Sequence, residues 1–254
     1  MGVTIKTAKE IEILREGGKR LSHVLYEVAS KVRAGMTKIE IDKMAEDLIV
    51  AGGDVPAFKN YKPSGARVAF PAVLCISVND EIVHGIPNNY KLKEGDIVGL
   101  DLGIKHKGLF TDMAVTVGIG EINKRAKRLM EVTSQALEFG ISVAKAGATT
   151  GDIGYAIESF VRPYKYGIVR ELSGHGVGHK IHEDPYIPNY GKRGTGTKLK
   201  PGMVLALEPM INEGDADIIL GDDNFTYKTR DGSRSAHFEK TILITEGDPE
   251  TLTP

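Results

Sequence analysis

Four acidic residues stand beside apolar segments, where a carboxylate is costly to bury without a positively charged partner. Asp101 and Glu208 each end an apolar segment, and Asp112 and Glu239 each stand just before one. Carboxylate oxygens are ligands for hard and borderline divalent cations. Because two divalent ions balance the charge of four carboxylates, a convergence of these residues predicts a site for two metal ions.

The spacing of the two aspartates indicates how the first pair of acids meets. The segment 102–111 predicts a β-hairpin centred between His106 and Lys107, and in that register Asp101 and Asp112 face each other directly across the strands. Like charges in such a pair are destabilising unless a cation lies between them. No lysine or arginine takes the obvious position, so a divalent metal is the expected partner.

A glycine-rich segment places three of the seven histidines within eight positions, at His175, His179 and His182. Gly174, Gly176 and Gly178 are expected to let the backbone approach a bound ligand closely. Their spacing is not Gly-x-Gly-x-x-Gly, and residues 191–198 lack the Gly-Lys-Ser/Thr of a phosphate-binding loop. The segment therefore predicts nitrogen ligands for a metal and excludes a nucleotide loop.

Short stretches of the sequence occur twice in the same order. The matching pairs are 34–37 with 146–149, 83–87 with 181–185, and 91–101 with 198–208. They predict an internal duplication, with 1–254 forming a single domain from halves of about 1–118 and 121–254 that share one core. In this alignment His84 is the counterpart of His182, and two neutral imidazoles can orient a substrate amide from two sides.

Helical and strand patterns follow one another in each half, which predicts an α+β fold. Thr7 with Glu10, and Thr37 with Glu40, form capping-box patterns in front of amphipathic helices. Further helices are expected over 123–145 and 150–162. The expected strands are 73–79, 96–102, 112–117, 203–208 and 239–245.

The composition excludes several classes of protein. The 254 residues carry 33 Lys and Arg against 34 Asp and Glu, which leaves no electrostatic footprint for nucleic acid or an anionic membrane. One cysteine cannot form an internal disulfide, and neither a membrane-spanning apolar run nor a signal core is present. We therefore expect a cytoplasmic protein, with Cys75 buried and with His23 and His106 on the surface.

Together these motifs resemble those of type I methionine aminopeptidases over nearly the whole chain. Besides the acids, the matching motifs are Cys-Ile-Ser-Val-Asn at 75–79, His-Gly-Ile-Pro at 84–87, Gly-His-Gly-Val-Gly at 174–178 and Ile-His-Glu-Asp-Pro at 181–185. The resemblance implies the pita-bread fold, in which two pseudo-twofold halves form a curved antiparallel sheet, covered by helices, around a dinuclear metal site. The implied reaction removes methionine from nascent proteins whose second residue is small and uncharged.

The resemblance also implies roles for individual residues. The implied ligands of two divalent ions (Co²⁺, Mn²⁺ or Fe²⁺) are Asp101, Asp112, His175, Glu208 and Glu239, with Asp112 and Glu239 bridging. Glu208 would act as the general base or proton shuttle, His182 would contact the scissile carbonyl, and His84 would hydrogen-bond the peptide nitrogen. The methionine pocket would be lined by Phe70, Cys75, Ile181 and Phe225.

Some alternatives stay open. The segment 58–70 looks about six residues longer than in common bacterial enzymes, which affects the pocket rim and not the metal centre. An Xaa-Pro aminopeptidase or prolidase-like peptidase shares the implied fold, but its usual N-terminal domain does not fit ahead of His84. A metal-free binding protein is the other alternative. We expect a monomer that acts on nascent N-termini, with a contact to the ribosome near the exit tunnel.

Overall fold

A nine-stranded antiparallel sheet forms the centre of the computed structural model, which describes residues 2–62 and 68–254. In spatial order its strands are β1 (Val55–Pro56), β4 (Ile97–His106), β5 (Leu109–Gly118), β14 (Glu239–Leu243), β9 (Val204–Leu207), β7 (Ser173–Gly176) and β8 (Glu183–Pro188). Two more strands pair off this path, β2 (Leu74–Val78) with β4 and β15 (Glu250–Thr251) with β14.

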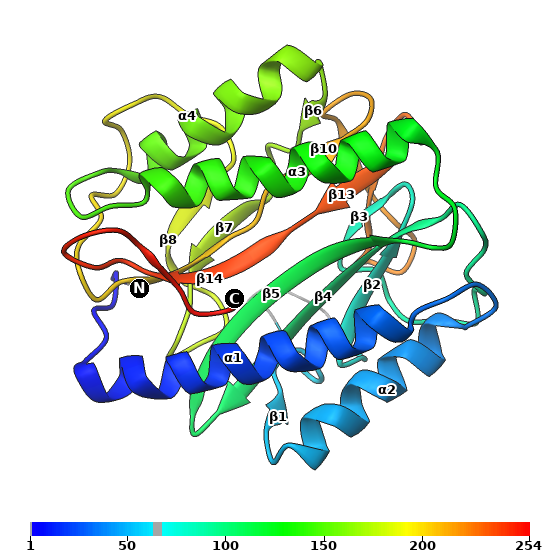
Figure 1. The fold of residues 1–254 in the computed structure, drawn as a ribbon, viewed down its shortest axis with the longest axis horizontal. Coiled ribbons are helices and arrows are strands. Elements are labelled where there is room, and N and C mark those ends of the chain that lie inside the picture. The colour runs from blue at the N-terminus through cyan, green and yellow to red at the C-terminus, as the bar shows by residue number, and fades with distance from the viewer. Residues whose placement is uncertain (1, 63–67) are drawn as a thin grey trace.

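Helices cover one face of this sheet (Figure 1). They are α1 (Ala8–Lys31), α2 (Lys38–Ala51), α3 (Lys124–Val143) and α4 (Thr150–Val161), which runs into a short 3₁₀ turn, η1 (Arg162–Tyr164). Figure 1 shows α1 and α3 on either side of the seam between β5 and β14.

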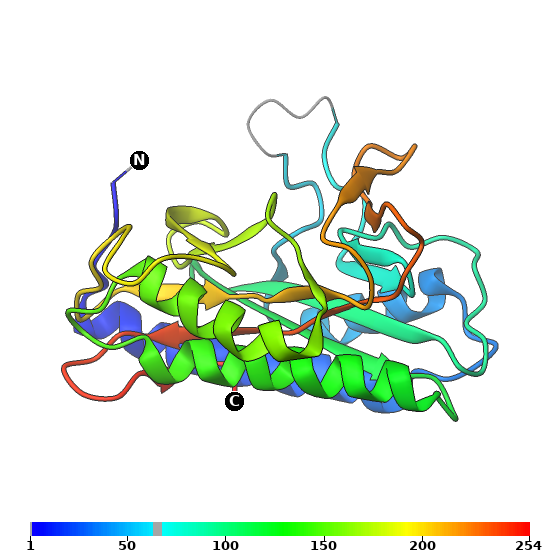
Figure 2. The ribbon, with the colours of Figure 1, turned by 90° about the horizontal axis from the view of Figure 1, so that it is seen from above.

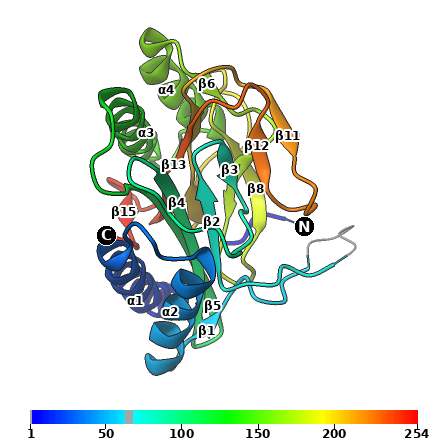
Figure 3. The ribbon, with the colours of Figure 1, turned by 90° about the vertical axis from the view of Figure 1, so that its right-hand side faces the viewer.

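Two small sheets adjoin the large one. The first contains β13 (Ser235–His237), β10 (Met210–Asn212) and β6 (Gly167–Ile168), and it packs against α3 through Ile168, Ile211 and Ala236. The second contains β11 (Ile218–Leu220), β12 (Tyr227–Thr229) and β3 (Glu81–Val83), and it stands on the side away from the helices (Figures 2 and 3). The large sheet therefore has a helix-covered face and a face bordered by short strands and loops.

The predicted helix starts are confirmed. Thr7 accepts a hydrogen bond from the backbone N–H of Glu10, and the Glu10 carboxylate accepts one from the backbone N–H of Thr7. Thr37 and Glu40 form the same capping box in front of α2, which ends at Gly52 as expected. Each box satisfies two of the unpaired amides at a helix start.

Two apolar clusters fill the space between helices and sheet. Leu21 of α1, Ile41 of α2 and Leu100 of β4 belong to the cluster under the first helix pair. Leu129 of α3 and Leu205 of β9 belong to the cluster under the second pair. Each helix pair thus buries its apolar side against strands from its own part of the chain, which is the usual source of helix stability in proteins.

The repeated segments occupy matching places in the structure. An isolated antiparallel bridge joins Thr37 to Lys91, and another joins Thr149 to Lys198. Each bridge connects the N-cap of the second helix of a pair to the segment that leads into a strand of the large sheet, β4 or β9. The division into halves near residues 118–121 stays a prediction, and these paired bridges support it.

The predicted register of the central hairpin is wrong. Asp101 pairs with Ala114 and Asp112 pairs with Gly103, so the two aspartates are diagonal and not direct neighbours. The turn consists of Lys107 and Gly108 at φ 46° and 92°. Positive φ at both positions is typical of a two-residue hairpin turn, and this turn moves the centre of the hairpin by one residue.

The prediction of a surface position for His106 is also wrong, whereas His23 is exposed as expected. His106 is 7% exposed, and its Nδ1 lies 2.6 Å from Oδ1 of Asp54. The reason is tertiary: α1 crosses the hairpin tip, so a Cβ placed on Gly17 would lie 3.1 Å from the His106 Cβ.

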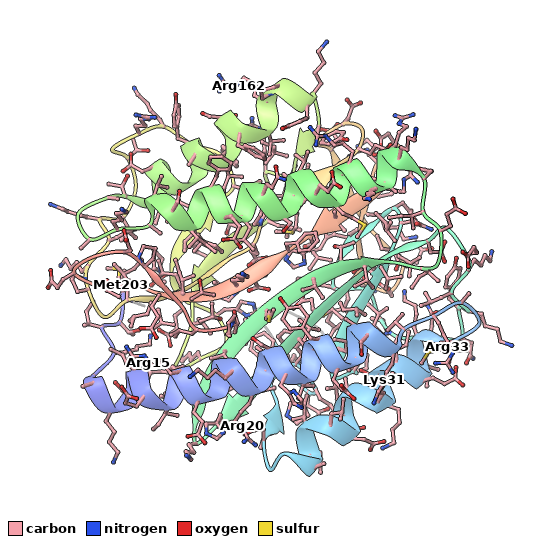
Figure 4. All side chains as sticks on the ribbon, in the orientation of Figure 1. Arg15, Arg20, Lys31, Arg33, Arg162 and Met203 are labelled. Atoms are coloured by element: carbon pink, nitrogen blue, oxygen red, sulfur yellow. The ribbon has the colours of Figure 1, made fainter. Side chains whose placement is uncertain are left out.

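Ion pairs tie α1 to other parts of the chain. Arg15 pairs with Glu250 of β15 at 2.7 Å, and Arg20 pairs with Asp54 at 2.7 Å. Both arginines are labelled along α1 in Figure 4.

Within the described ranges, the helices include none whose length and apolar character would let it cross a membrane.

We predict that Gly18→Ala lowers the free energy of unfolding by about 1–3 kcal/mol, because overpacking costs about that much. A Cβ at Gly18 would lie 2.1 Å from the backbone oxygen of Leu252, which must shift. Gly140→Ala is the matched control, because its Cβ meets the Ile157 side chain at 3.0 Å and that side chain can move. Urea unfolding measures both, and equal losses would contradict this packing.

Candidate metal centre

Three of the predicted acids lie on adjacent strands at the seam of the sheet. Asp101 of β4 and Glu239 of β14 both pair with Ala114 of β5, one from each side. Asp112 lies two residues before Ala114, so its side chain points to the same face of the pleated sheet. This arrangement brings the three carboxylates together: one oxygen from each lies within 4.8 Å of the others.

The other two predicted ligands come from β9 and β7. Glu208 directly follows β9, and His175 pairs with Ala206 of β9. His175 Nε2 lies 3.4 Å from Oε1 of Glu208 and 3.9 Å from Oδ2 of Asp112. Ligand atoms of His175, Glu208 and Glu239 also lie within 4.8 Å of one another. The structure therefore gathers all five residues at one place.

A backbone contact determines which nitrogen of His175 faces the acids. Nδ1 lies 2.9 Å from the carbonyl oxygen of Gly176. A carbonyl can only accept a hydrogen bond, so Nδ1 carries the proton and Nε2 presents its lone pair to the carboxylates. This is the orientation typical of a metal-binding histidine with a fixed tautomer.

The electrostatics of the cluster require positive charge. Burial raises the pKa of Asp101 to about 7, and it raises the pKa of Asp112, Glu208 and Glu239 well above the usual values. The cationic partners that the structure gives these acids are imidazoles, and burial lowers the pKa of the His175 imidazole to about 3, which keeps it neutral.

Orphaned atoms lead to the same conclusion. Oδ1 of Asp101 and Oε1 of Glu239 are buried without a hydrogen-bond partner among the described residues. A buried carboxylate oxygen with no donor is costly. A carboxylate-rich set with one imidazole suits borderline divalent ions. These residues therefore fit divalent metal ions.

His84 and His182 lie beside the cluster. The His182 ring centroid is 4.4 Å from that of His175, and its Nδ1 lies 2.9 Å from the hydroxyl of Tyr61. His84 follows β3 at φ 59°, and burial together with the nearby His182 lowers its pKa to about 4. His179 lies elsewhere, because its Nε2 is 2.7 Å from Glu10 on α1.

The glycines of the histidine segment have a different role from the one expected. A Cβ at Gly174 would lie 2.4 Å from the backbone oxygen of Ala206, and one at Gly176 would lie 2.2 Å from that of Asp184. A Cβ at Gly178 would lie 2.3 Å from Cε of Lys6. These contacts are with neighbouring strands and a side chain, so the glycines permit close packing rather than approach to a ligand.

The residues expected to line a methionine pocket lie in one apolar cluster. Phe70, Cys75 and Ile181 are buried, and Phe225 packs edge-on to Phe70 at 5.5 Å between ring centroids. Cys75 pairs directly with Asp101 across β2 and β4, and burial raises the pKa of its thiol. The cluster therefore adjoins the carboxylates.

The longer segment 58–70 falls partly on residues 63–67, which lie outside the described residues.

His237 is a site residue to which the sequence analysis assigned no role. It is 2% exposed, and its Nε2 has no hydrogen-bond partner among the described residues. That atom lies 3.7 Å from Oε2 of Glu208 and 4.0 Å from Oε2 of Glu239. One feature of the sequence could have identified His237 as a site residue. It stands two residues before Glu239 in an extended segment, and this spacing places both side chains on one face.

The fold and this centre define a metallopeptidase, and comparison with known proteins agrees. The profile of metallopeptidase family M24 matches residues 12–246. The chain belongs to metallopeptidase family M24, and its full-length relatives there are methionine aminopeptidases. Methionine aminopeptidase 1 of Bacillus subtilis is 42% identical over 251 residues, which are 99% of each protein.

Solved structures give the same result. The methionine aminopeptidase of Rickettsia prowazekii superposes with a TM-score of 0.96 at 38% identity, over 100% of both chains. That of Thermotoga maritima gives 0.94 at 43% identity, over 99% of both chains. The predicted pita-bread fold and the predicted family are thereby confirmed.

We predict that Mn²⁺ stabilises chelator-treated protein. At about 100 times Kd the gain is about 2.7 kcal/mol, or roughly 5–10 °C in Tm for a chain of this size. Glu239→Gln should lose most of that shift, because Glu239 belongs to two of the ligand groups. Glu131→Gln, at an exposed position on α3, should keep it. Thermal unfolding with and without Mn²⁺ tests this, and an undiminished shift in Glu239→Gln would show that the ions bind elsewhere.

Proposed function

We propose that this chain removes the N-terminal methionine from polypeptides whose second residue is small and uncharged, with two divalent ions as cofactors. The observation that carries the proposal is the convergence of three buried carboxylates, the partly exposed Glu208 carboxylate and one imidazole at the seam of the sheet. The names of the full-length relatives support methionine as the residue removed.

The proposed ligands are Asp101, Asp112, His175, Glu208 and Glu239. Asp112, Glu239 and His175 each belong to two of the ligand groups, whereas Asp101 and Glu208 each belong to one. His175 offers a single ligand atom, because its Nδ1 faces the carbonyl of Gly176, but a carboxylate has two oxygens and can contact two ions. This sharing supports Asp112 and Glu239 as the bridging ligands. The donor set accepts Co²⁺, Mn²⁺ or Fe²⁺.

When bound, the ions would supply a water of lowered pKa and polarise the scissile carbonyl. Glu208 is proposed to take the proton of the attacking water and pass it on. Its two oxygens face different imidazoles, with Oε1 3.4 Å from His175 and Oε2 3.7 Å from His237. A general base must lie within hydrogen-bond reach of the group that it deprotonates, and Glu208 borders the centre of the cluster.

His182 and His84 are proposed to hold the substrate amide. If the Tyr61 hydroxyl donates to His182 Nδ1, then His182 Nε2 carries the proton and can donate to the scissile carbonyl oxygen. His84 is proposed to contact the peptide nitrogen. A Cβ on Gly85 would lie 2.2 Å from the backbone oxygen of Ile76, so the segment that carries His84 is held closely against β2.

The methionine side chain is proposed to enter the apolar cluster beside the acids, lined by Phe70, Cys75, Ile181 and Phe225. An apolar pocket next to a polar centre is the usual form of such a site.

We further propose that the protein acts in the cytoplasm as a monomer, on chains leaving the ribosome. The balanced charge and the single cysteine support this setting.

A direct test compares peptides. Mn²⁺-loaded protein should release methionine from Met-Gly-Met and from Met-Ala-Met, and it should release little from Met-Lys-Met. Cleavage of Xaa-Pro peptides alone would favour the prolidase-like alternative. Tight binding of a protein or nucleic acid with no cleavage and no bound metal would favour the binding-protein alternative.

We predict that Glu208→Gln lowers kcat for Met-Gly-Met by roughly 10²–10⁴-fold, because it removes the proposed base. The fold should persist, since glutamine has nearly the same shape and the backbone oxygen of Glu208 still accepts from Asn189 at 3.0 Å. Glu171→Gln, at an exposed position, is the control and should retain parental kcat. A Glu208→Gln enzyme within a few-fold of the parent would remove Glu208 from this role.

A further inference from the structure

Lys6 is a buried lysine that the proposed chemistry does not use. The residue is 4% exposed, and its Nζ lies 2.6 Å from Oε2 of Glu183. Both side chains are almost fully buried, at 1% and 6% exposure. Because a buried ammonium requires a partner, this ion pair fixes the N-terminal segment against the segment that carries His182.

Glu183 connects several parts of the structure. Its Oε2 also accepts from the Thr4 hydroxyl, and its Oε1 accepts from the backbone N–H of Lys180 at 2.9 Å. The carboxylate therefore closes the segment from Lys180 to Glu183 into a loop, with His182 inside it. Lys6 is held in turn by its backbone N–H, which donates to the carbonyl of Gly202 at 2.8 Å.

The stem of Lys6 supports the other end of this loop. Gly178 has φ 141°, and a Cβ placed there would lie 2.3 Å from Cε of Lys6. The lysine stem thus occupies the space beside Gly178, while its ammonium pairs with Glu183. One side chain contacts both ends of the segment that carries His182.

The His182 ring also contacts two side chains. Its centroid lies 4.4 Å from that of His175 and 5.3 Å from that of Tyr61, and its Nδ1 shares a hydrogen bond with the Tyr61 hydroxyl. We propose that Lys6 is a positioning residue, which acts through Glu183 to hold His182 at the angle needed to meet the scissile carbonyl. This inference rests on the proposed function, because it assigns His182 to the substrate.

A second ion pair provides a matched control. Lys38 is 1% exposed, and its Nζ lies 2.7 Å from Oε2 of Glu81, which also accepts from the backbone N–H of Val78 at 2.8 Å. This pair is buried to a similar degree, but it joins α2 to the β2–β3 connection. Losing it removes the same type of interaction from the segment that leads to His84 and leaves the segment that carries His182 intact.

The experiment is a double-mutant cycle on the Mn²⁺-loaded enzyme with Met-Gly-Met. Lys6→Met should lower kcat by about tenfold, since displacing an orienting group by about 1 Å costs one to two orders of magnitude, while KM changes less. In a His182→Ala background, Lys6→Met should change kcat by less than about twofold. Metal content should equal that of the parent in every variant.

Lys38→Met should give the same fold-change with and without His182. Equal losses from Lys6→Met in both backgrounds would overturn the proposal and leave Lys6 a purely structural residue. If Lys6→Met does not fold, the double variant Lys6→Met/Glu183→Gln leaves no unpaired charge and enters the same cycle. Failure of the parent to release methionine would contradict the proposed function instead, so the two failures are distinguishable.

Discussion

The mutual repulsion of four closely spaced carboxylates, three of them buried, is the constraint on which the rest of the structure depends. Asp101, Asp112 and Glu239 are within hydrogen-bonded strands at the seam, so their backbones cannot move apart to relieve the repulsion. A low-polarity surrounding makes that repulsion stronger than it would be in water. The helices pack against one face of the sheet, and divalent ions bound among the carboxylates would offset their repulsion.

The two parts of the chain contribute unequally to the site, although their segments match. Ser77 pairs with Gly99, and His175 pairs with Ala206, which matches Gly99 at the repeat offset of 107. Ser77 therefore occupies the place of His175 in the first part. Its hydroxyl accepts from the backbone N–H of Gly85, next to His84, at 3.2 Å. One part thus places an imidazole beside the acids, and the other uses the same position to support the segment that carries His84.

Local patterns were sufficient to predict much of the fold and the site. Capping boxes such as Thr7 with Glu10 depend on residues three apart, and the acids at strand ends follow from period-two patterns. One failure arose from a local turn, and the other two depended on contacts distant in sequence. The hairpin register followed a turn at Lys107, and the burial of His106 followed the crossing of α1. The third, the role of Gly178, depended on Lys6, which is more than 170 residues away.

The central claim is that the carboxylate cluster holds two divalent ions. The most direct measurement is anomalous diffraction at the manganese edge from crystals grown with Mn²⁺. The account predicts two anomalous peaks among the five proposed ligands, both beside Asp112 and Glu239. A cluster without peaks, with manganese bound only at other surfaces of the protein, would contradict it.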